Sequence, residues 1–99
     1  MGTRALTHLK PYKIWIVTQF DGYPEGLGKD LTFVAKNKLS REEGLKYINE
    51  KHEIRAKGKT KSEALNYYLG KKYTPTDYDI WIEYVWAITS DWKVEGGRK

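Results

Sequence analysis

Residues 12–20, YKIWIVTQF, decide the fold expected of this chain. In an extended chain successive side chains of this stretch would face opposite sides. β-branched and aromatic residues dominate it, which is typical of a strand. Residues 77–88, DYDIWIEYVWAI, repeat the pattern and predict a second long strand. Residues 3–9 and 92–94 are shorter runs of the same kind. We therefore expect two strands at each end of the chain.

Three helices are expected between these strands. Apolar residues at helical spacing predict one over residues 27–37. Residues 40–43, SREE, and 60–63, TKSE, have capping-box spacing, so a helix begins at each, and Gly70 ends the last one. The order β-β-α-α-α-β-β indicates an α+β fold, with a small antiparallel sheet in which the terminal strands meet and with the helices packed on one face. The 99 residues suit one domain, with residues 95–99 as a flexible tail.

Composition excludes several classes of protein. The chain has no cysteine, which rules out disulfide scaffolds, thiol nucleophiles and zinc ribbons. No stretch approaches the roughly 18 apolar residues of a membrane span, and the amino terminus lacks the apolar core of a secretory signal. We expect a cytoplasmic protein without a membrane partner.

The net charge of +5 is concentrated in residues 51–61, KHEIRAKGKTK. The commoner interpretation of such a segment is a solvated linker between helices. The alternative is a surface for nucleic acid, since clustered cations bind phosphate backbones. The residues that would carry this alternative are Lys51, Arg55, Lys57, Lys59 and Lys61.

The second face of the expected sheet is less polar than a face meant only for water. Trp15, Val17, Trp81 and Val85 fall on it if residues 12–20 and 77–88 are both strands. Exposed, they would form an apolar patch of the size that marks an interface, which predicts a homo-oligomer. Two alternatives remain: the second helix or the basic segment covers this face, or its aromatic residues form a stacking platform for bases.

The titratable residues form no catalytic pattern. His8 and His52 have no sequence partner that suggests a nucleophile and base, so we interpret His8 as a strand residue and His52 as a solvated one. Asp77 and Asp79 would share a face of an extended segment, but they match no metal-ligand spacing. We expect a protein that is not an enzyme and uses no cofactor or metal.

A glycine-containing loop precedes the first expected helix. Gly26-Leu27-Gly28 would place free backbone N–H groups at a helix start, where an anion can bind. The loop is not a Walker loop, because Asp30 follows Lys29 where a hydroxyl residue is needed. A structural loop, with Asp21 or Asp30 capping the helix, is the favoured interpretation.

The same region carries a resemblance. MGTRALT at residues 1–7 and QFDGYPEGLG at residues 19–28 resemble an amino-terminal MGTR-[small]-LT and an internal QFDGYP-x-G-x-G signature. Both signatures belong to a family of small uncharacterised proteins of bacteriophages, prophages and archaeal mobile elements. The resemblance implies a virus-associated role, in the host cytoplasm, and small virus proteins of that kind often inhibit or sequester host-defence components. It implies no active site.

The signature residues define a candidate ligand site if the first two strands pair as a hairpin. A cation, an amide and an aromatic hydroxyl would suit a nucleotide or another phosphate-bearing ligand. The favoured alternative is a structural network in which Asp21 pairs with Arg4 and the glycines supply positive φ. The candidate residues are Arg4, Gln19, Asp21, Tyr23, Gly26 and Gly28.

Two functions follow from these patterns. The first is a non-enzymatic, homo-oligomeric binding protein of a virus or mobile element that acts on a host protein or sequesters a small nucleotide-like ligand. The second is a nucleic-acid-binding accessory protein that uses the basic segment.

Overall fold

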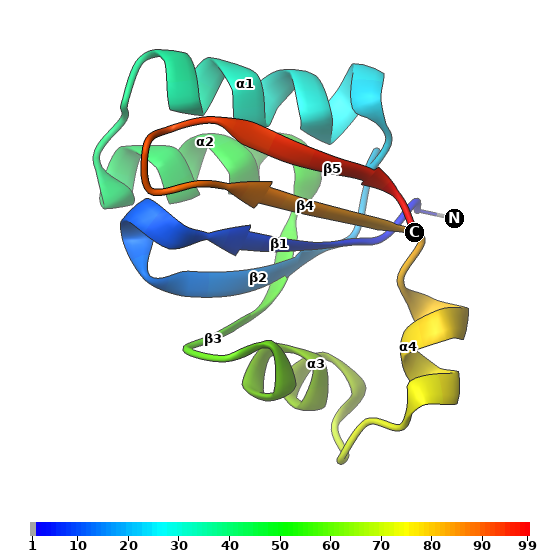
Figure 1. Ribbon diagram of the computed structural model, residues 1–99. Coiled ribbons are helices and arrows are strands. Elements are labelled where there is room, and N and C mark those ends of the chain that lie inside the picture. The colour runs from blue at the N-terminus through cyan, green and yellow to red at the C-terminus, as the bar shows by residue number, and fades with distance from the viewer. Residues whose placement is uncertain (1) are drawn as a thin grey trace.

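A computed structural model describes residues 2–99 and confirms the α+β class (Figure 1). The strands are β1 (Ala5–Leu9), β2 (Ile14–Thr18), β3 (Ile54–Gly58), β4 (Tyr84–Ile88) and β5 (Val94–Arg98). They form one sheet in the order β3-β2-β1-β4-β5. The strands from the two ends of the chain do meet, as β1 beside β4, but this pair is parallel while the other three pairs are antiparallel. The sheet is therefore mixed, because the chain crosses over through two helices before β4 and returns in the direction of β1.

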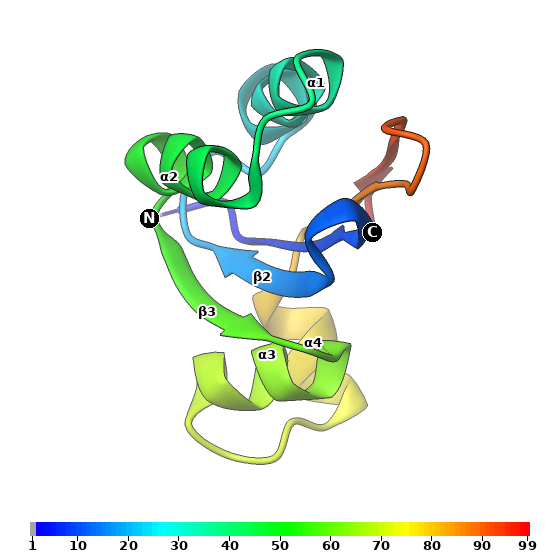
Figure 2. The ribbon, with the colours of Figure 1, turned by 90° about the vertical axis from the view of Figure 1, so that its left-hand side faces the viewer.

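Helices cover both faces of the sheet rather than one (Figure 2). The helices are α1 (Lys29–Lys36), α2 (Arg41–His52), α3 (Lys61–Leu69) and α4 (Pro75–Trp81). We call the side under α1 and α2 the covered face. Its core includes Leu9, Ile14, Ile16, Leu31, Ile48 and Ile88. On the opposite side α3 and α4 contribute to a smaller core of Leu6, Val17, Ala56, Ala64, Leu65 and Ile82.

The predicted starts of α2 and α3 are confirmed. The Ser40 and Thr60 side chains accept hydrogen bonds from the N–H groups of Glu43 and Glu63 at 3.2 and 3.1 Å. These bonds satisfy N–H groups that have no partner within the helix. Gly70 ends α3 in the left-handed conformation, at φ 73°.

The first part of the predicted strand 77–88 is instead helix α4. Thr74 and Asp77 form a capping box, in which each side chain accepts a hydrogen bond from the other's backbone N–H, and Pro75 fills the first turn. The bonds from Thr74 lower the pKa of the Asp77 carboxyl below its ordinary value. The interpretation of Asp77 and Asp79 as an extended pair was wrong, because local capping outweighed the alternating pattern.

Two segments that were expected to be irregular are strands. Residues 54–58, within the basic segment, pair with β2 as an edge strand, so the prediction of a linker over residues 51–61 was wrong. Residues 95–98, expected in a flexible tail, pair with β4. Both strands gain their order from a neighbouring strand, which their own sequences do not reveal. No helix within residues 2–99 has the length and apolar character needed to cross a membrane.

Candidate functional site

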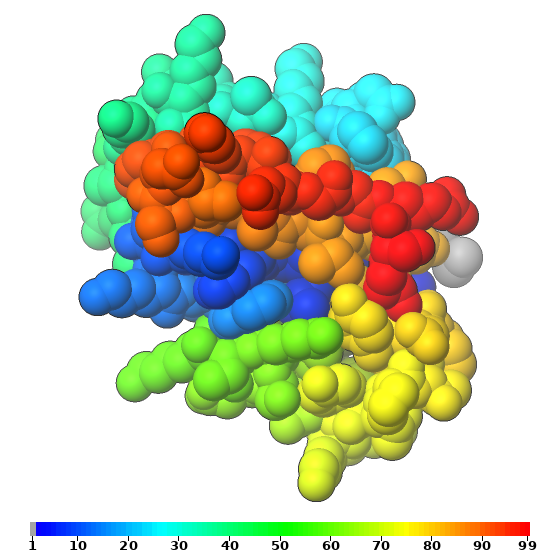
Figure 3. Space-filling view, in the orientation of Figure 1, coloured from blue at the N-terminus to red at the C-terminus, as the bar shows by residue number. Residues whose placement is uncertain are grey.

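Part of the sheet face opposite α1 and α2 has no helix over it. Figure 3 shows side chains of β1, β2, β4 and β5 reaching the surface there, with α3 and α4 along one side. Pairing between the strands places one row of residues across this area: Trp15 lies opposite His8, His8 opposite Ala87, and Ala87 opposite Glu95. We call this row, with Lys10 and Val85 beside it, the open face.

Two aromatic rings of the open face are stacked. The rings of His8 and Trp15 are 4.0 Å apart between centroids, with an angle of 7° between their planes. Both side chains are half-buried, so the pair is fixed in place and still reaches solvent. A stacked pair on a rigid sheet is a platform on which another flat ring can continue the stack.

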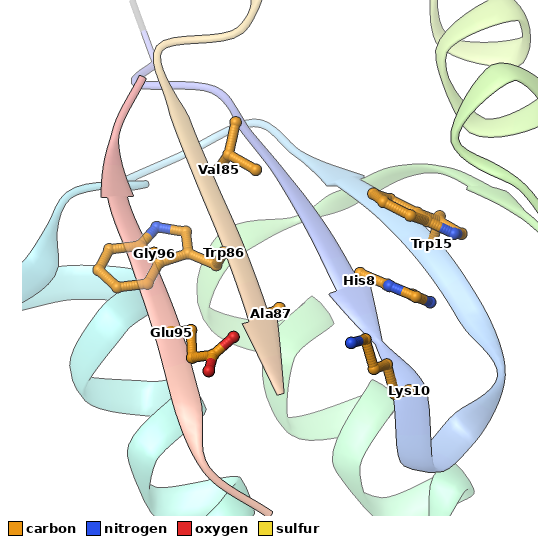
Figure 4. A pocket seen from close by; sticks show the side chains of 8 residues that line it. All are labelled: His8, Lys10, Trp15, Val85, Trp86, Ala87, Glu95 and Gly96. Atoms are coloured by element: carbon orange, nitrogen blue, oxygen red, sulfur yellow. The ribbon is translucent and has the colours of Figure 1, made fainter. Parts of the chain in front are cut away.

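A hollow of about 380 Å³ lies beside this pair (Figure 4). Ala87 leaves room at its centre, and Val85 adds an apolar part to its wall. Lys10 lies on the His8 side of Ala87, and Glu95 on the β5 side. The hollow therefore has an apolar floor and one charge of each sign at its edges, with a size suited to a small ligand.

The charges of the open face are not neutralised within the protein. Lys10 and Glu95 are exposed, and neither takes part in an ion pair within residues 2–99. Burial, and then the charge of Lys10, lower the pKa of His8 below its ordinary value. His8 is therefore neutral at neutral pH and offers an uncharged ring to a ligand.

The β1–β2 connection fixes this arrangement. Lys10–Tyr12 form a single 3-10 turn, and Lys13 adopts the left-handed conformation at φ 57°. The turn is held because the buried Tyr12 donates its hydroxyl to the carbonyl of Leu39 at 2.9 Å. A turn centred between Pro11 and Tyr12 is what sets His8 opposite Trp15.

Sequence reasoning missed the residues that complete the open face. His8 was weighed as a general base and interpreted as a strand residue, and Lys10, Ala87 and Glu95 were not considered as site residues. The position of Pro11 between the first two strands could have suggested the register of His8 with Trp15. Glu95 could not have been found in this way, because the strand expected over residues 92–94 ended before it.

The glycine-containing loop is held by its own contacts. The Asp21 carbonyl accepts the N–H of Leu27 at 2.7 Å, and its carboxylate accepts the hydroxyl of Tyr23 at 3.0 Å. This last bond raises the pKa of the Tyr23 hydroxyl. A Cβ at Gly26 would lie 2.3 Å from the Asp21 carbonyl oxygen, and one at Gly28 would lie 2.8 Å from the Trp86 ring. The glycines therefore allow close packing, but neither has a positive φ, so the expectation that the glycines of this loop supply positive φ was wrong.

The side chains of Arg4 and Gln19 make their hydrogen bonds outside this loop and form none with Asp21. The Arg4 Nε donates to the Trp81 carbonyl at 2.8 Å, and its guanidinium lies 5.1 Å from the centre of the Trp81 ring. Gln19 accepts the hydroxyl of Tyr68 at 3.3 Å. The expected pairing of Arg4 with Asp21 was therefore wrong. The structure divides the six candidate residues into the loop and a separate contact with α3 and α4.

The four predicted interface residues do not share a surface. Val17 is fully buried under α3, within the smaller core. Trp81 lies on α4, where it is 41% exposed. Only Trp15 and Val85 belong to the open face. The prediction of one apolar patch failed because α3 covers Val17 and because Trp81 belongs to a helix rather than to a strand.

The basic residues are also distributed over several elements. Lys51 ends α2 near the Tyr47 ring, and Lys61 begins α3 with its Nζ 4.2 Å from the centre of the Tyr78 ring. Lys59 lies in the connection between β3 and α3. Only Arg55 and Lys57 share a hollow, on the β3 edge, where Tyr67 and Ile54 also line it.

His52 is buried rather than solvated, contrary to expectation. Its Nε2 lies 2.6 Å from the Asp30 carboxylate, and its Nδ1 lies 2.9 Å from the Phe20 carbonyl. Asp30, predicted as a possible helix cap, instead joins α1 to the end of α2. The ring is only 2% exposed, so this is a structural bridge and not a site that a ligand can reach.

Within residues 2–99 no three acidic or histidine side chains are grouped closely enough to hold a metal ion. The open face combines stacked rings, a hollow and unpaired charges. No family model, curated protein or solved structure gives a significant match to this chain.

Proposed function

We propose that this protein is a non-enzymatic binding protein whose open face holds a nucleobase that carries a phosphate. The observation that carries this proposal is the stacked pair of His8 and Trp15 beside a hollow with an apolar floor. Stacking on such a pair accepts any base, because every base has a flat π-face. The source of the base can be a free nucleotide or an unpaired strand.

The charge of the protein supports an anionic ligand. The net charge is +5, and Lys10 at the edge of the hollow has no protein partner within residues 2–99. A lysine ammonium beside a stacking platform can contact the phosphate or a carbonyl of the nucleotide. The neutral ring of His8 adds stacking area without a second fixed charge.

The proposed ligand includes both the nucleotide-like ligand and the nucleic acid that the sequence suggested. The proposed site is the open face, in place of the glycine-containing loop and the basic segment. The virus-associated setting implied by the resemblance, a host-protein partner and a homo-oligomer all stay predictions. A second copy of the chain would compete for the open face if that face were the oligomer interface. Binding and self-association can therefore be separated experimentally.

The test measures the fluorescence anisotropy of labelled single strands of about twelve nucleotides at about 50 mM salt. Replacing Trp15 with leucine, or His8 with serine, should weaken binding roughly 5- to 100-fold, since stacking on one aromatic residue contributes about 1–3 kcal/mol per base. Free nucleotides are titrated in parallel by calorimetry. Tight binding of the free nucleotide alone would identify a sequestering protein, and much tighter binding of the strand would identify a nucleic-acid accessory protein.

The control is a change on the basic edge strand. Tyr67 is 73% exposed beside Arg55 and Lys57, so Tyr67→Ala and Lys57→Ala together remove that surface while leaving the open face intact. The double variant should bind within about twofold of the original protein after correction for one lost charge. If it loses binding and the Trp15 and His8 variants do not, the basic segment is the site. If the protein binds neither ligand and forms an oligomer that the Trp15→Leu change dissociates, the proposed function is wrong.

A further inference from the structure

We infer that the open face selects guanine over the other bases, an inference that rests on the proposed function. The observation behind it is the arrangement of one donor group and one acceptor group around the place where a stacked base would lie. Lys10 and Glu95 extend toward each other from opposite sides of Ala87 (Figure 4). Their charges would attract, yet the two groups form no ion pair. Space for a ligand edge therefore lies between them, above an alanine.

Glu95 supplies only acceptors. An ionised carboxylate has two oxygens and no proton to donate, so it prefers a ligand edge with two adjacent N–H groups. The Watson–Crick edge of guanine has such a pair, at N1 and N2. Adenine and cytosine each place a ring acceptor next to their amino group, and uracil has a single N–H between two carbonyls. The carboxylate would therefore be repelled by part of every base except guanine.

Lys10 supplies only donors. The O6 carbonyl of guanine follows its N1–H along the same edge, so one base can present an acceptor to an ammonium and two donors to a carboxylate. Lysine is a common partner of this oxygen in base recognition. The two residues lie on separate elements, at the β1–β2 turn and on β5, and neither takes part in an ion pair within residues 2–99. Together they match three consecutive groups of the guanine edge, the O6 carbonyl, the N1–H and the N2 amino group.

The position of Glu95 is fixed by its backbone. It pairs with Ala87 in the register of β4 and β5. The next residue, Gly96, has φ 124°, and a Cβ there would lie 2.1 Å from the carbonyl oxygen of Val85. Glycine at this position therefore lets β5 approach β4 closely enough to bring Glu95 to the edge of the hollow.

The test compares four 5′-monophosphates by calorimetry at neutral pH: those of guanosine, inosine, adenosine and uridine. Inosine lacks only the N2 amino group of guanosine. We expect the guanosine nucleotide to bind roughly 5- to 150-fold more tightly than the adenosine and uridine nucleotides, with the inosine nucleotide between them. Glu95→Gln should abolish this preference, because an amide can pair with either kind of edge. Binding of the adenosine nucleotide should stay within about threefold, since stacking on His8 and Trp15 is unchanged.

Glu50→Gln is the matched control. Glu50 is an exposed glutamate on α2, on the far side of the sheet, so this change alters the net charge equally and should leave the preference intact. Equal binding of all four nucleotides by the unaltered protein would overturn guanine selection while leaving the proposed function in place. A preference that persists in Glu95→Gln would show that Glu95 does not recognise the base. Failure to bind any nucleotide or strand would instead reject the proposed function itself.

Discussion

The two faces of the sheet differ in how they satisfy their polar groups. On the covered face, α1 and α2 exclude water, and the one histidine near this core, His52, faces an acceptor with each ring nitrogen. On the open face, His8 is half-buried and stacks on Trp15, while Lys10 and Glu95 are left without ion-pair partners within residues 2–99. The same residue type therefore holds two helices together on one side and forms part of a candidate site on the other.

The difference lies in what a substitution would disturb. Covered positions are part of a close-packed core, where a lost contact or an unpaired polar group lowers stability. Open positions have solvent beside them, so a change there mainly alters what the surface can bind. The following predictions test this contrast, beginning with the largest expected effect.

Two neighbouring residues of β4 offer the strongest contrast. Ile88 is fully buried under the helices, and Ala87 faces the hollow. Ile88→Asn should lower the free energy of unfolding by about 3–5 kcal/mol, because it leaves a cavity and buries an amide. Ala87→Asn should change it by about 1 kcal/mol or less and should block ligand binding. Urea denaturation measures the free energy of unfolding of both variants. Equal losses of this free energy at the two positions would contradict the contrast between the faces.

The second prediction compares the two histidines. His52→Leu removes the histidine partner of the Phe20 carbonyl and of the Asp30 carboxylate, so we expect a loss of about 1–3 kcal/mol. His8→Leu removes no protein hydrogen bond and keeps an apolar side chain over the sheet, so its loss should stay below about 1 kcal/mol. Thermal and urea unfolding of both variants provide the measurement. A larger loss for His8 would mean that its stacking with Trp15 stabilises the fold more than the buried bridge does.

The smallest expected effect is on how the stability of the protein depends on pH. The pKa of His8 is lower in the folded protein than its ordinary value in an unfolded chain, so the unfolded chain takes up this proton first as the pH falls. Protonation therefore favours the unfolded state, and stability from this group is present above the unfolded pKa and decreases as the pH falls below it. His8→Gln should lose less stability than the original protein on acidification, since all other titrating groups are shared. If the stability of the two proteins depends on pH in the same way, burial and Lys10 do not lower the pKa of His8.

The elements that were predicted well are those with a local cause. The long alternation in residues 12–20 gave β2, and the caps at Ser40 and Thr60 fixed the starts of α2 and α3. Each of these signals is contained in a few consecutive residues, so no distant contact is needed to form it. The glycine-containing loop is held by local contacts of Asp21 with Tyr23 and Leu27, but the expected pairing of Asp21 with Arg4 was wrong.

The elements that were missed depend on competition or on partners. In residues 75–81 a capping box and an alternating pattern coexist, and only one of them can form. Strands β3 and β5 are polar or glycine-rich, and they are strands because β2 and β4 offer them hydrogen-bond partners. Helix α3 follows β3 on the second side of the sheet, which is why the helices divide between the two faces and the expected apolar patch is mostly covered.

By itself the sequence determined the α+β class, the strand β2, two helix starts and the absence of cysteine chemistry. Only the tertiary structure decided the parallel pairing of β1 with β4, the burial of His52 and the assembly of the open face. His8 lies on β1, whereas Ala87 and Glu95 lie on β4 and β5 near the other end of the chain, and the alignment of the three depends on strand register. Short-range patterns specify which residues form an element, whereas register and long-range pairing specify which side chains meet.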